Sequence, residues 1–361
     1  MTATRAWAQK EKNGGLVLCE FDLPEPGPHQ VVVRVISSGV CHTQLWEMTL
    51  DRDGPLLLGH EGYGIVVATG GKVTTVAEGD HVLLTWLPGP GAAERAPQPV
   101  RVDLGGGTLG APVKVFTWAE HTLADELYVK KLSGPVTEAA AVVGCAVFTG
   151  AGAALNEARM QPGERIAVFG TGGVGLSAIA AARIGGAERI VAIDLSDAKL
   201  ALARDFGATD LVNAAREDPV ARILDLLPGR CLCCNPGADV AIDCVGASTV
   251  TRQALESVRV STRGVETGGR CLVIGVPEKP LLLDIRGMLH DNKTLMASSG
   301  GSSGHGDLDR ILGWCDEGGF DLERLVTDRF AFVETPEAVE CLRRGEIRGR
   351  AIISIQGMPV H

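Results

Sequence analysis

The sequence predicts an α/β fold with two parts, a β-rich part followed by a doubly wound parallel sheet. Strand-like runs separated by turn residues fill about the first 130 residues, and strand and helix patterns alternate from about residue 162. Glycine is abundant, at 47 residues, which suits an architecture with many tight turns. Because 361 residues exceed what one hydrophobic core usually serves, we expect two domains.

The β-rich part is indicated by the runs QVVVRVISS, GYGIVVATG and DHVLLTW. They are rich in β-branched residues, and turn signals such as PEPGPH and AEGD separate them. Residues 88–112 are rich in Gly and Pro and show neither helical nor strand periodicity, so this segment is predicted to be a loop.

The second part alternates between strand and helix. The predicted strands are RIAVFG, RIVAID, ADVAIDCVG and RCLVIGVP, and the tail ends in a further strand, RAIISI. The helix after RIVAID has Ser196 as its expected N-cap and Gly207 as its expected stop. Strands joined by helices form parallel crossovers, which predicts the doubly wound sheet.

A glycine-rich turn, GTGGVG, joins the first of these strands to its helix. Gly170, Gly172 and Gly175 fit G-x-G-x-x-G, which allows a tight turn, close approach of a pyrophosphate and close helix packing. Asp194 ends the next strand, 19 residues past Gly175, where a carboxylate accepts a ribose hydroxyl and repels a 2′-phosphate. We therefore expect NAD rather than NADP, with Lys199 adding a contact; the alternative is a glycine-rich turn of another α/β domain.

A metal site is the second chemical feature that the sequence indicates. The segment GVCHTQLW contains Cys41, which alone is compatible with a metal ligand, a redox thiol or ordinary core. His60 in LLLGHEGYG and Cys145 in VVGCAVFTGAG would complete a Cys₂His set, and catalytic zinc takes three such ligands and keeps one open position. The metal would acidify an alcohol, and Thr43 would pass on its proton.

Taken together, these segments resemble the zinc-containing medium-chain alcohol dehydrogenases. The resemblance rests on GVCHT, LGHEGYG, GDHV, GCAVFTGAGAA, VFGTGGVG and AIDLSDAK, in the family order from about residue 5 to the C-terminus. It implies a GroES-like β-rich catalytic domain over residues 1–147, completed by 299–361, and a Rossmann domain over 148–298.

The resemblance also implies roles for individual residues. One catalytic zinc per chain would be bound by Cys41, His60 and Cys145. Thr43 would be the hydroxyl of the proton relay, Glu61 a carboxylate beside the metal, and His42 a group near the cofactor phosphates. The remaining implied contacts with NAD(H) are Gly173, Val174 and Thr149, the backbone of Ile274, Val276, Ala297 and Ser299, and Arg350 or its neighbour Arg348.

The chain departs from the family at several positions. The residue after Thr43 is commonly an Asp that orients the zinc-bound His, but here it is Gln44, and Trp46 replaces a common relay His. Residues 88–112 lack the four cysteines of a structural zinc, which we expect to be absent. The CLCC segment, at Cys231, Cys233 and Cys234, is expected to be a loop with free thiols, and a metal site is the alternative.

Three tryptophans are candidates for the alcohol pocket. They are Trp46, Trp86 and Trp118, and the alternative is that they are ordinary core residues. If they line the pocket, they favour a flat or apolar alcohol over a polyol.

The predicted function is interconversion of an alcohol and an aldehyde or ketone with zinc and NAD(H). Two alternatives stay open: reduction of an iminium or enone substrate on the same scaffold, and a catalytically silent dinucleotide-binding protein. The net charge of −10 and the absence of a basic stripe disfavour a nucleic-acid partner. The N-terminus lacks an export signal and the apolar run 139–155 suits a buried helix, so we expect a cytoplasmic protein without a membrane partner. The resemblance implies a homodimer, with a tetramer as the alternative.

Overall fold

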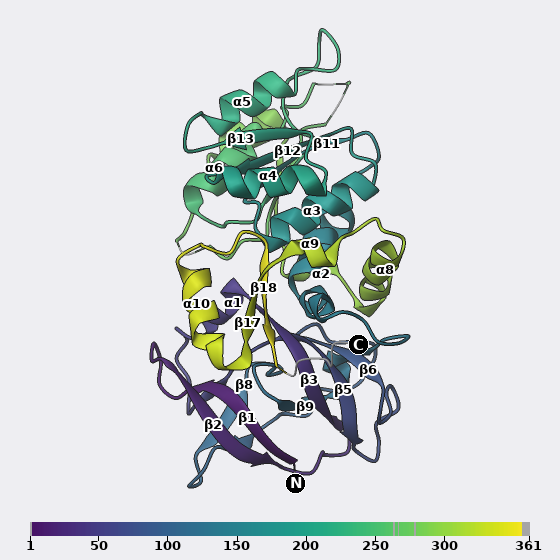
Figure 1. The fold of residues 1–361 in the computed structure, drawn as a ribbon. Coiled ribbons are helices and arrows are strands. Elements are labelled where there is room, and N and C mark those ends of the chain that lie inside the picture. Colours follow the sequence, from purple (N-terminus) through teal and green to yellow (C-terminus); the bar gives the residue numbers. More distant parts are fainter. Residues whose placement is uncertain (1, 263, 266, 278, 356–361) are drawn as a thin grey trace. The chain divides into compact units, whose positions relative to one another are not determined.

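The computed structural model describes residues 2–262, 264–265, 267–277 and 279–355 (Figure 1). They form two compact units. The first unit runs to Cys145 and takes in Gly304–Arg310 and the chain from Asp321 onward, and the second comprises Ala146–Ser303 and Ile311–Phe320. The domain boundaries that the resemblance implies lie close to these divisions, except that Ile311–Phe320 groups with the second unit.

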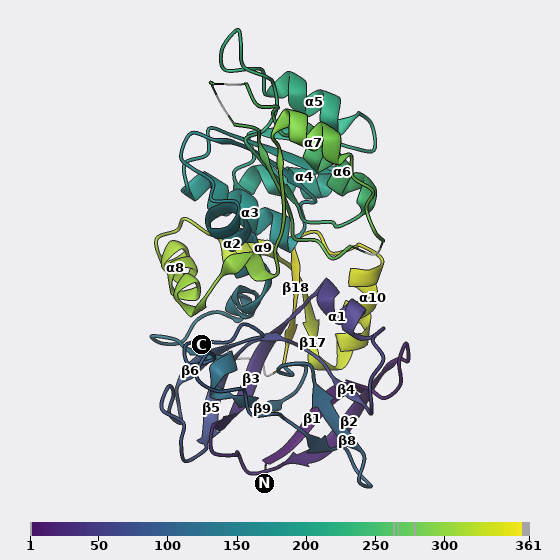
Figure 2. The same cartoon turned by 180° about the vertical axis from the view of Figure 1, so that it is seen from behind.

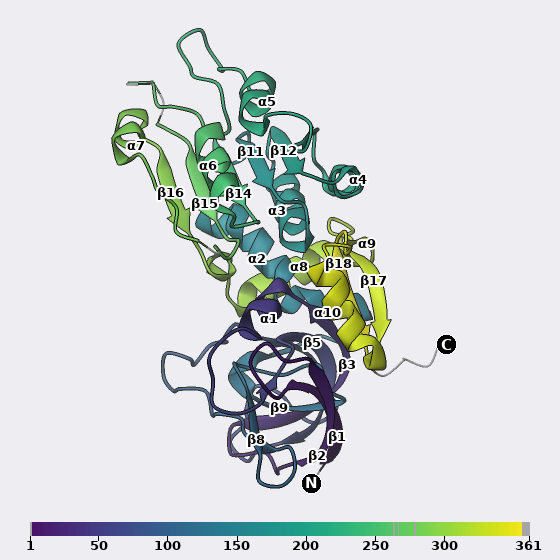
Figure 3. The ribbon, with the colours of Figure 1, turned by 90° about the vertical axis from the view of Figure 1, so that its left-hand side faces the viewer.

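The first unit is the β-rich part, and its strands curl around a shared core (Figure 3). A five-stranded sheet has the order β2-β1-β4-β8-β7, and a seven-stranded sheet has the order β10-β6-β5-β3-β18-β17 with β9 paired to β3. The strand bounds are β1 Thr2–Gln9, β2 Leu16–Leu23, β3 Gln30–Val40, β4 Leu56–Leu57, β5 Glu61–Thr69, β6 His81–Thr85, β7 Val102–Asp103, β8 Leu109–Pro112, β9 His121–Asp125, β10 Val129–Lys131, β17 Val326–Ala331 and β18 Arg350–Ser354.

The C-terminal strands complete the sheet of the N-terminal part. Strand β18 pairs antiparallel with β3, with Ala351 opposite Val40 and Ile352 opposite Gly39. Strand β17 adds in parallel to β18. This pairing brings Arg350, at the start of β18, beside residues from the first quarter of the chain.

The segment between residues 88 and 112 differs from the expected loop, because it contains β7 and β8. These strands are two and four residues long, too short for a periodic pattern. The segment is held by Arg95, whose guanidinium donates to both carboxylate oxygens of Asp125 at 2.7 and 2.8 Å. A backbone N–H at Gln98 also donates to Asp125, at 2.6 Å.

The second unit contains the predicted parallel sheet, with the strand order β13-β12-β11-β14-β15-β16. All its pairings are parallel, which confirms the doubly wound arrangement. The bounds are β11 Arg165–Phe169, β12 Arg189–Asp194, β13 Asp210–Asn213, β14 Val240–Asp243, β15 Arg270–Val273 and β16 Thr294–Ala297.

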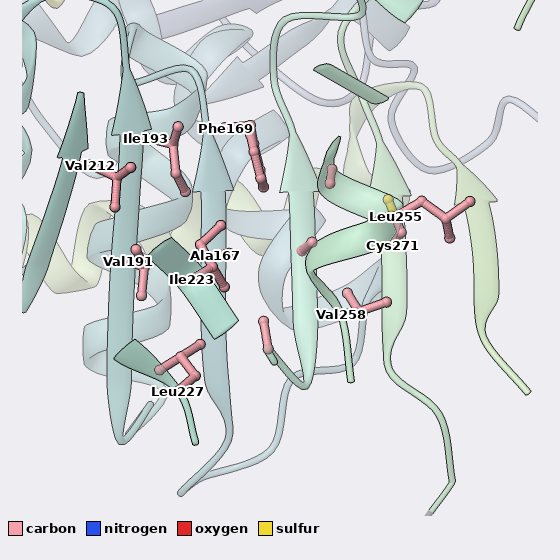
Figure 4. Packing of buried hydrophobic residues seen from close by; sticks show 13 residues of the cluster. Ala167, Phe169, Val191, Ile193, Val212, Ile223, Leu227, Leu255, Val258 and Cys271 are labelled. Carbon is pink, nitrogen blue, oxygen red and sulfur yellow. The ribbon is translucent and has the colours of Figure 1, made fainter. Parts of the chain in front are cut away.

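Helices cover both faces of this sheet (Figures 1 and 2). One face is covered by α3 (Gly173–Ile184) and α4 (Asp197–Phe206), and the other by α5 (Pro219–Leu226), α6 (Ser248–Ser257) and α7 (Ile285–Asp291). Figure 4 shows the core of the second face, where Ile223, Leu227 and Leu255 pack against the strands. The predicted caps of α4 are confirmed: the Ser196 side chain accepts from the Lys199 N–H, and Gly207 adopts a left-handed conformation, with φ 119°.

Further helices and 3₁₀ turns connect these elements. They are α1 (His42–Glu47), α2 (Ala146–Gly152), α8 (His305–Asp316), α9 (Leu322–Leu325) and α10 (Thr335–Arg343), and 3₁₀ turns η1, η4 and η5 lie at Glu126–Tyr128, Gly300–Ser302 and Phe332–Glu334.

The apolar run 139–155 is buried but is not one helix, contrary to expectation. It forms the 3₁₀ helix η2 (Glu138–Gly144), then α2, then the π-helical turn η3 (Ala153–Glu157). The chain breaks at Cys145, whose φ and ψ are −149° and −76°. Within the described residues no single helix is long and apolar enough to cross a membrane; the segments on either side of Cys145 reach that length and composition only when they are counted together.

Candidate metal and cofactor sites

The first unit brings Cys41, His60 and Cys145 together. Cys41 follows β3 and caps α1, His60 precedes β5, and Cys145 lies at the break between η2 and α2. Their ligand atoms all lie within 4.8 Å of one another, and all three side chains are buried. The two sulfurs are 3.9 Å apart, and His60 Nε2 is buried with no hydrogen-bond partner. A buried imidazole nitrogen without a partner beside two thiols fits a metal with nitrogen and sulfur ligands.

The local sequence explains how His60 is placed. Gly59 has a φ of +93°, and a Cβ there would lie 2.5 to 2.7 Å from atoms of Thr117 and Trp118. Only glycine therefore allows this tight approach before the ligand. Thr117 in turn donates its hydroxyl to the carbonyl of Glu61, at 3.1 Å, which fixes the chain just after His60.

The electrostatics of the two thiols also suit a cation. The hydrogen bond between the thiols lowers the pKa of Cys41 well below its usual value, against the effect of burial, with further help from His60 and Arg350. The same hydrogen bond, together with burial, raises the pKa of Cys145 well above its usual value. Without a metal the pair therefore holds one proton strongly, and a bound cation would displace it.

Two polar groups contact or approach the cluster. The indole N–H of Trp86 donates to Cys145 Sγ at 3.3 Å. The hydroxyl oxygen of Thr43 lies 3.6 Å from Cys41 Sγ, in a half-buried position. His42, at the start of α1, is exposed. A thiol, an exposed imidazole and a hydroxyl therefore occupy the consecutive positions Cys41, His42 and Thr43.

The three candidate pocket tryptophans differ in position. Trp86 is half-buried on Cys145, whereas Trp46 is 49% exposed. Trp118 is fully buried, donates its indole N–H to the Gly39 carbonyl at 3.1 Å, and packs with Val40 and Leu58. The position of Trp118 favours the core alternative over the pocket for this residue.

Glu61 and Arg350 form a buried ion pair in the same unit. The Arg350 guanidinium donates to Glu61 Oε1, and the two residues are 5% and 0% exposed. A Cβ at Gly39 would lie 2.4 Å from that oxygen, so glycine makes room for the carboxylate. Arg348, the other candidate for a pyrophosphate contact, is exposed. The structure thus gives Arg350 a protein partner, and its contact with the cofactor stays a prediction.

The sequence did not predict that Glu47 is a buried residue of this unit. This carboxylate ends α1, is 8% exposed and lies on the same helix face as the buried Gln44. Burial raises its pKa, the charge of His60 lowers it, and the charge of Cys41 raises it. The only sequence signal was its spacing of three residues from Gln44, which places both side chains on one side of a helix.

The glycine-rich turn of the second unit has the expected geometry. Gly170 has a φ of +85°, and a Cβ at Gly175 would lie 1.9 Å from the Gly170 carbonyl oxygen. A Cβ at Gly172, the N-cap of α3, would meet nothing within 4 Å. The open space in front of a helix N-terminus suits a pyrophosphate.

Asp194 lies beside this turn and is hydrogen-bonded to it. Its Oδ2 accepts from the N–H and hydroxyl of Thr171, at 2.8 and 3.1 Å, and its Oδ1 accepts from the Ser196 N–H at 3.0 Å. These bonds hold the carboxylate at the end of β12, beside the turn, where a ribose would lie. Lys199 is half-buried in the first turn of α4.

The residues implied to contact the nicotinamide also lie in the second unit, unlike Arg350 and His42. Thr149, in α2, has a buried hydroxyl without a partner. Gly173 and Val174 open α3, Ile274 and Val276 follow β15, Ala297 ends β16, and Ser299 lies two residues later. A buried hydroxyl without a partner is the feature among these that points to a ligand.

The CLCC segment differs from the expected loop of free thiols. A disulfide joins Cys231 and Cys234, and Cys233 Sγ lies 2.9 Å from Cys231 Sγ. The three sulfurs lie within 4.8 Å of one another, and a metal site there would require the disulfide to be reduced. The segment lies between α5 and β14, in the second unit.

Comparisons with known proteins agree with both sites. Residues 27–134 match the alcohol dehydrogenase GroES-like domain, and residues 173–317 match the zinc-binding dehydrogenase domain. The chain is 31% identical to S-(hydroxymethyl)glutathione dehydrogenase of Synechocystis sp., over 95% of this chain and 97% of that protein. It is 33% identical to the Escherichia coli protein of the same name, over 92% of this chain and 94% of that protein.

A solved structure with the same fold is benzyl alcohol dehydrogenase from Acinetobacter calcoaceticus. It is 27% identical, has a TM-score of 0.86 and covers 99% of this chain and 100% of its own. The fold and the two sites thus define a dehydrogenase with a GroES-like and a Rossmann domain. The chain belongs to the zinc-containing medium-chain alcohol dehydrogenase family, whose cofactors are zinc and NAD(H) and whose reaction interconverts an alcohol and an aldehyde or ketone.

Proposed function

We propose that Cys41, His60 and Cys145 bind the catalytic zinc of an NAD-dependent alcohol dehydrogenase. The observation that carries this proposal is a pair of buried thiols 3.9 Å apart beside the unpartnered His60 Nε2. When bound, zinc lowers the pKa of an alcohol and stabilises negative charge on its oxygen. The residues around it have to bind the alcohol, orient it and remove its proton.

Thr43 is the first residue of the proposed proton path. Its half-buried hydroxyl lies beside the cluster, 3.6 Å from Cys41 Sγ, where it can accept the proton of the alcohol as it releases its own proton toward His42 or water. His42, the adjacent residue, is exposed, so its imidazole can pass a proton to water. Trp46 cannot take part because its indole N–H is a donor only and has no lone pair with which to accept a proton. The path therefore ends at His42 or at solvent.

The proposed NAD site lies in the second unit. The N-terminus of α3, with Gly172 to Val174, would bind the pyrophosphate, and Asp194 would accept the ribose hydroxyls. A carboxylate fixed by three hydrogen bonds cannot turn away from a 2′-phosphate, so NAD is favoured over NADP. The Thr149 hydroxyl and the chain after β15 and β16 would contact the nicotinamide.

We propose an alcohol with a flat, apolar substituent as substrate. Trp86 supports this proposal because it is half-buried with its indole directed at Cys145, so its ring borders the site. The names of two relatives supply test compounds, benzyl alcohol and S-(hydroxymethyl)glutathione. The first has the flat apolar group that a tryptophan favours, and the second carries a charged peptide.

We propose that the protein is located in the cytoplasm and forms a homodimer. The free buried thiols of Cys41 and Cys145 support a reducing compartment, because thiolate ligands must stay unoxidised, and we expect the Cys231–Cys234 disulfide to be reduced there. The homodimer rests on the family alone, and light scattering of the purified protein would distinguish it from a tetramer.

The test is NADH formation by the zinc-loaded protein, the zinc-depleted protein and the depleted protein after zinc is restored. We expect oxidation of benzyl alcohol that is lost with zinc and regained with it. Zinc-independent reduction of an enone or iminium compound would favour the reductase alternative. Binding of NAD without turnover of any alcohol or carbonyl compound would favour the silent alternative.

A further inference from the structure

We propose that Cys231, Cys233 and Cys234 form a second metal site, which binds a Cu(I) ion through three thiolates once the disulfide among them is reduced. The three cysteines lie in the loop between α5 and β14, in the second unit. The site is independent of the proposed zinc site. The disulfide between Cys231 and Cys234 is the oxidised form of the loop, and it excludes the metal because it uses two of the three sulfurs.

A tight turn gathers the three cysteines. The Cys234 N–H donates to the Cys231 carbonyl at 3.1 Å, which closes a four-residue turn. The Cα atoms of these two residues are 5.0 Å apart, so their side chains start close together. Leu232 is fully exposed and Cys233 is exposed, so the middle of the turn faces solvent. The backbone therefore brings the sulfurs together at a place that a metal ion can reach.

The turn is also held by contacts other than the disulfide. A Cβ at Gly229 would lie 2.0 Å from the Cys234 carbonyl oxygen, so the chain can fold back here only over a glycine. The Thr262 hydroxyl donates to the Cys233 carbonyl at 3.1 Å, and the Asn235 side-chain amide donates to Thr262 Oγ1 at 3.2 Å. These contacts do not involve the sulfurs, so we expect the turn to persist when the disulfide is reduced.

Cys233 is the observation that a purely structural disulfide leaves unexplained. It is a free and exposed cysteine, yet its Sγ lies 2.9 Å from Cys231 Sγ. All three sulfurs lie within 4.8 Å of one another. A disulfide needs two thiols, whereas a metal ion can use all three.

The ligand atoms of this group indicate the kind of metal. Among the residues that the structure describes, no His, Asp or Glu ligand atom joins the three sulfurs within 4.8 Å. Structural zinc almost always takes four ligands in a tetrahedron, whereas soft thiolate ligands select Cu(I). Three sulfurs without nitrogen or oxygen therefore suit Cu(I) better than zinc. The cluster of Cys41, His60 and Cys145 differs because it mixes sulfur with nitrogen.

Reduction of the disulfide opens the site. A dithiol breaks the S–S bond between Cys231 and Cys234 by thiol–disulfide exchange, and it leaves as its own disulfide. The two cysteine sulfurs gain the two electrons and two protons that the dithiol loses. Cu(I) then displaces the protons of the three thiols and stays monovalent, so the binding step itself needs no oxidant or reductant.

The cysteine loop lies at the opposite edge of the sheet from the proposed NAD site. Strands β14 and β11 are parallel, and the loop precedes β14, so it lies at the amino ends of the strands. Arg230, beside the cysteines, donates to the carbonyl of Gly163, just before β11, at 2.7 Å. The glycine-rich turn and Asp194 follow the carboxyl ends of β11 and β12. A strand of five residues spans about 17 Å, so a metal at the cysteines would not touch the cofactor.

The test is an anaerobic titration of the zinc-loaded protein with Cu(I), in competition with a coloured Cu(I) chelator. The protein is first reduced with a dithiol, which is then removed. Cys233→Ser removes the third thiol but keeps the pair that forms the disulfide, and Cys341→Ser, in α10, is the control that removes a half-buried thiol elsewhere. We expect the unchanged protein and the control to bind about one Cu(I) per chain that Cys233→Ser loses, with zinc retained in all three.

Further measurements make the result independent of one variant. Cys234→Ser removes a different ligand and should lose the same copper, and the oxidised unchanged protein should bind none at this site. The dissociation constant of NAD should be the same with and without copper. Equal copper binding by Cys233→Ser and the unchanged protein would overturn the inference, and so would equal binding by the oxidised and reduced proteins. Copper that only replaces zinc, mole for mole, would also overturn it, because the metal would then lie at Cys41, His60 and Cys145.

Discussion

The buried ion pair between Arg350 and Glu61 gives a prediction whose size follows from the structure. Replacing Arg350 by Met removes the guanidinium that pairs with the buried Glu61 carboxylate. Breaking a buried ion pair in this way typically costs about 3–5 kcal/mol, because one charge stays in a nonpolar environment. An exposed pair, such as Arg343 with Glu340, is worth about 1 kcal/mol or less.

Native-state hydrogen exchange measures this cost within the first unit. The amides of β3 and β18 are suitable probes because these strands pair beside Arg350. A loss of about 3–5 kcal/mol corresponds to exchange roughly 100- to 5,000-fold faster. The control, Arg343→Met, should change exchange by less than about tenfold.

A double variant separates the loss of the cation from the effect of the remaining buried carboxylate. Glu61→Gln/Arg350→Met removes both charges, so it should be more stable than Arg350→Met alone. If Arg350→Met exchanges no faster than the control, or if the double variant is the less stable of the two, the ion pair does not stabilise the fold as argued.

Three further predictions concern other parts of the molecule. Burial opposes ionisation of Asp125, but hydrogen bonds from Arg95 and two backbone amides outweigh it and lower its pKa. The stabilisation is therefore present above the unfolded pKa of 3.8 and is lost as the pH falls through the lower folded pKa. We expect Asp125→Asn to reduce the melting temperature at about pH 7 and to reduce it much less near pH 2. Trp86→Phe removes the N–H bond to Cys145 and should weaken zinc binding by roughly tenfold or more in chelator competition, with an unchanged circular dichroism spectrum. Asp194→Ala should raise the dissociation constant of NAD by roughly 10- to 100-fold and reduce the preference over NADP, with the zinc content unchanged; an equal effect on both cofactors would contradict the assigned role.

Much of the fold was predictable because its signals are local. The turn GTGGVG, the Ser196 cap and the Gly207 stop lie within a few residues of the elements that they define, and each is confirmed. The three residues of the metal cluster were also predicted, from segments whose family pattern is specific, and the structure brings them within 4.8 Å.

The features that escaped prediction depend on packing between distant segments. Arg350 and Glu61 are 289 positions apart, so no local pattern reveals their contact. Trp118 fits a pocket position in the sequence, but the core closes around it. Glu47 reads as one more surface acid until the packing of α1 shows that its face points inward. The break at Cys145 was hidden because the run is apolar throughout, and composition alone does not show where such a run turns.

The most direct test of the central claim is the zinc content of the purified protein and of Cys145→Ser, measured by elemental analysis. We predict about one zinc per chain in the unchanged protein, and a large loss in Cys145→Ser, because catalytic zinc needs all three protein ligands. Metal-free protein that still binds NAD and cannot be reconstituted would contradict the claim, as would a full zinc complement in Cys145→Ser.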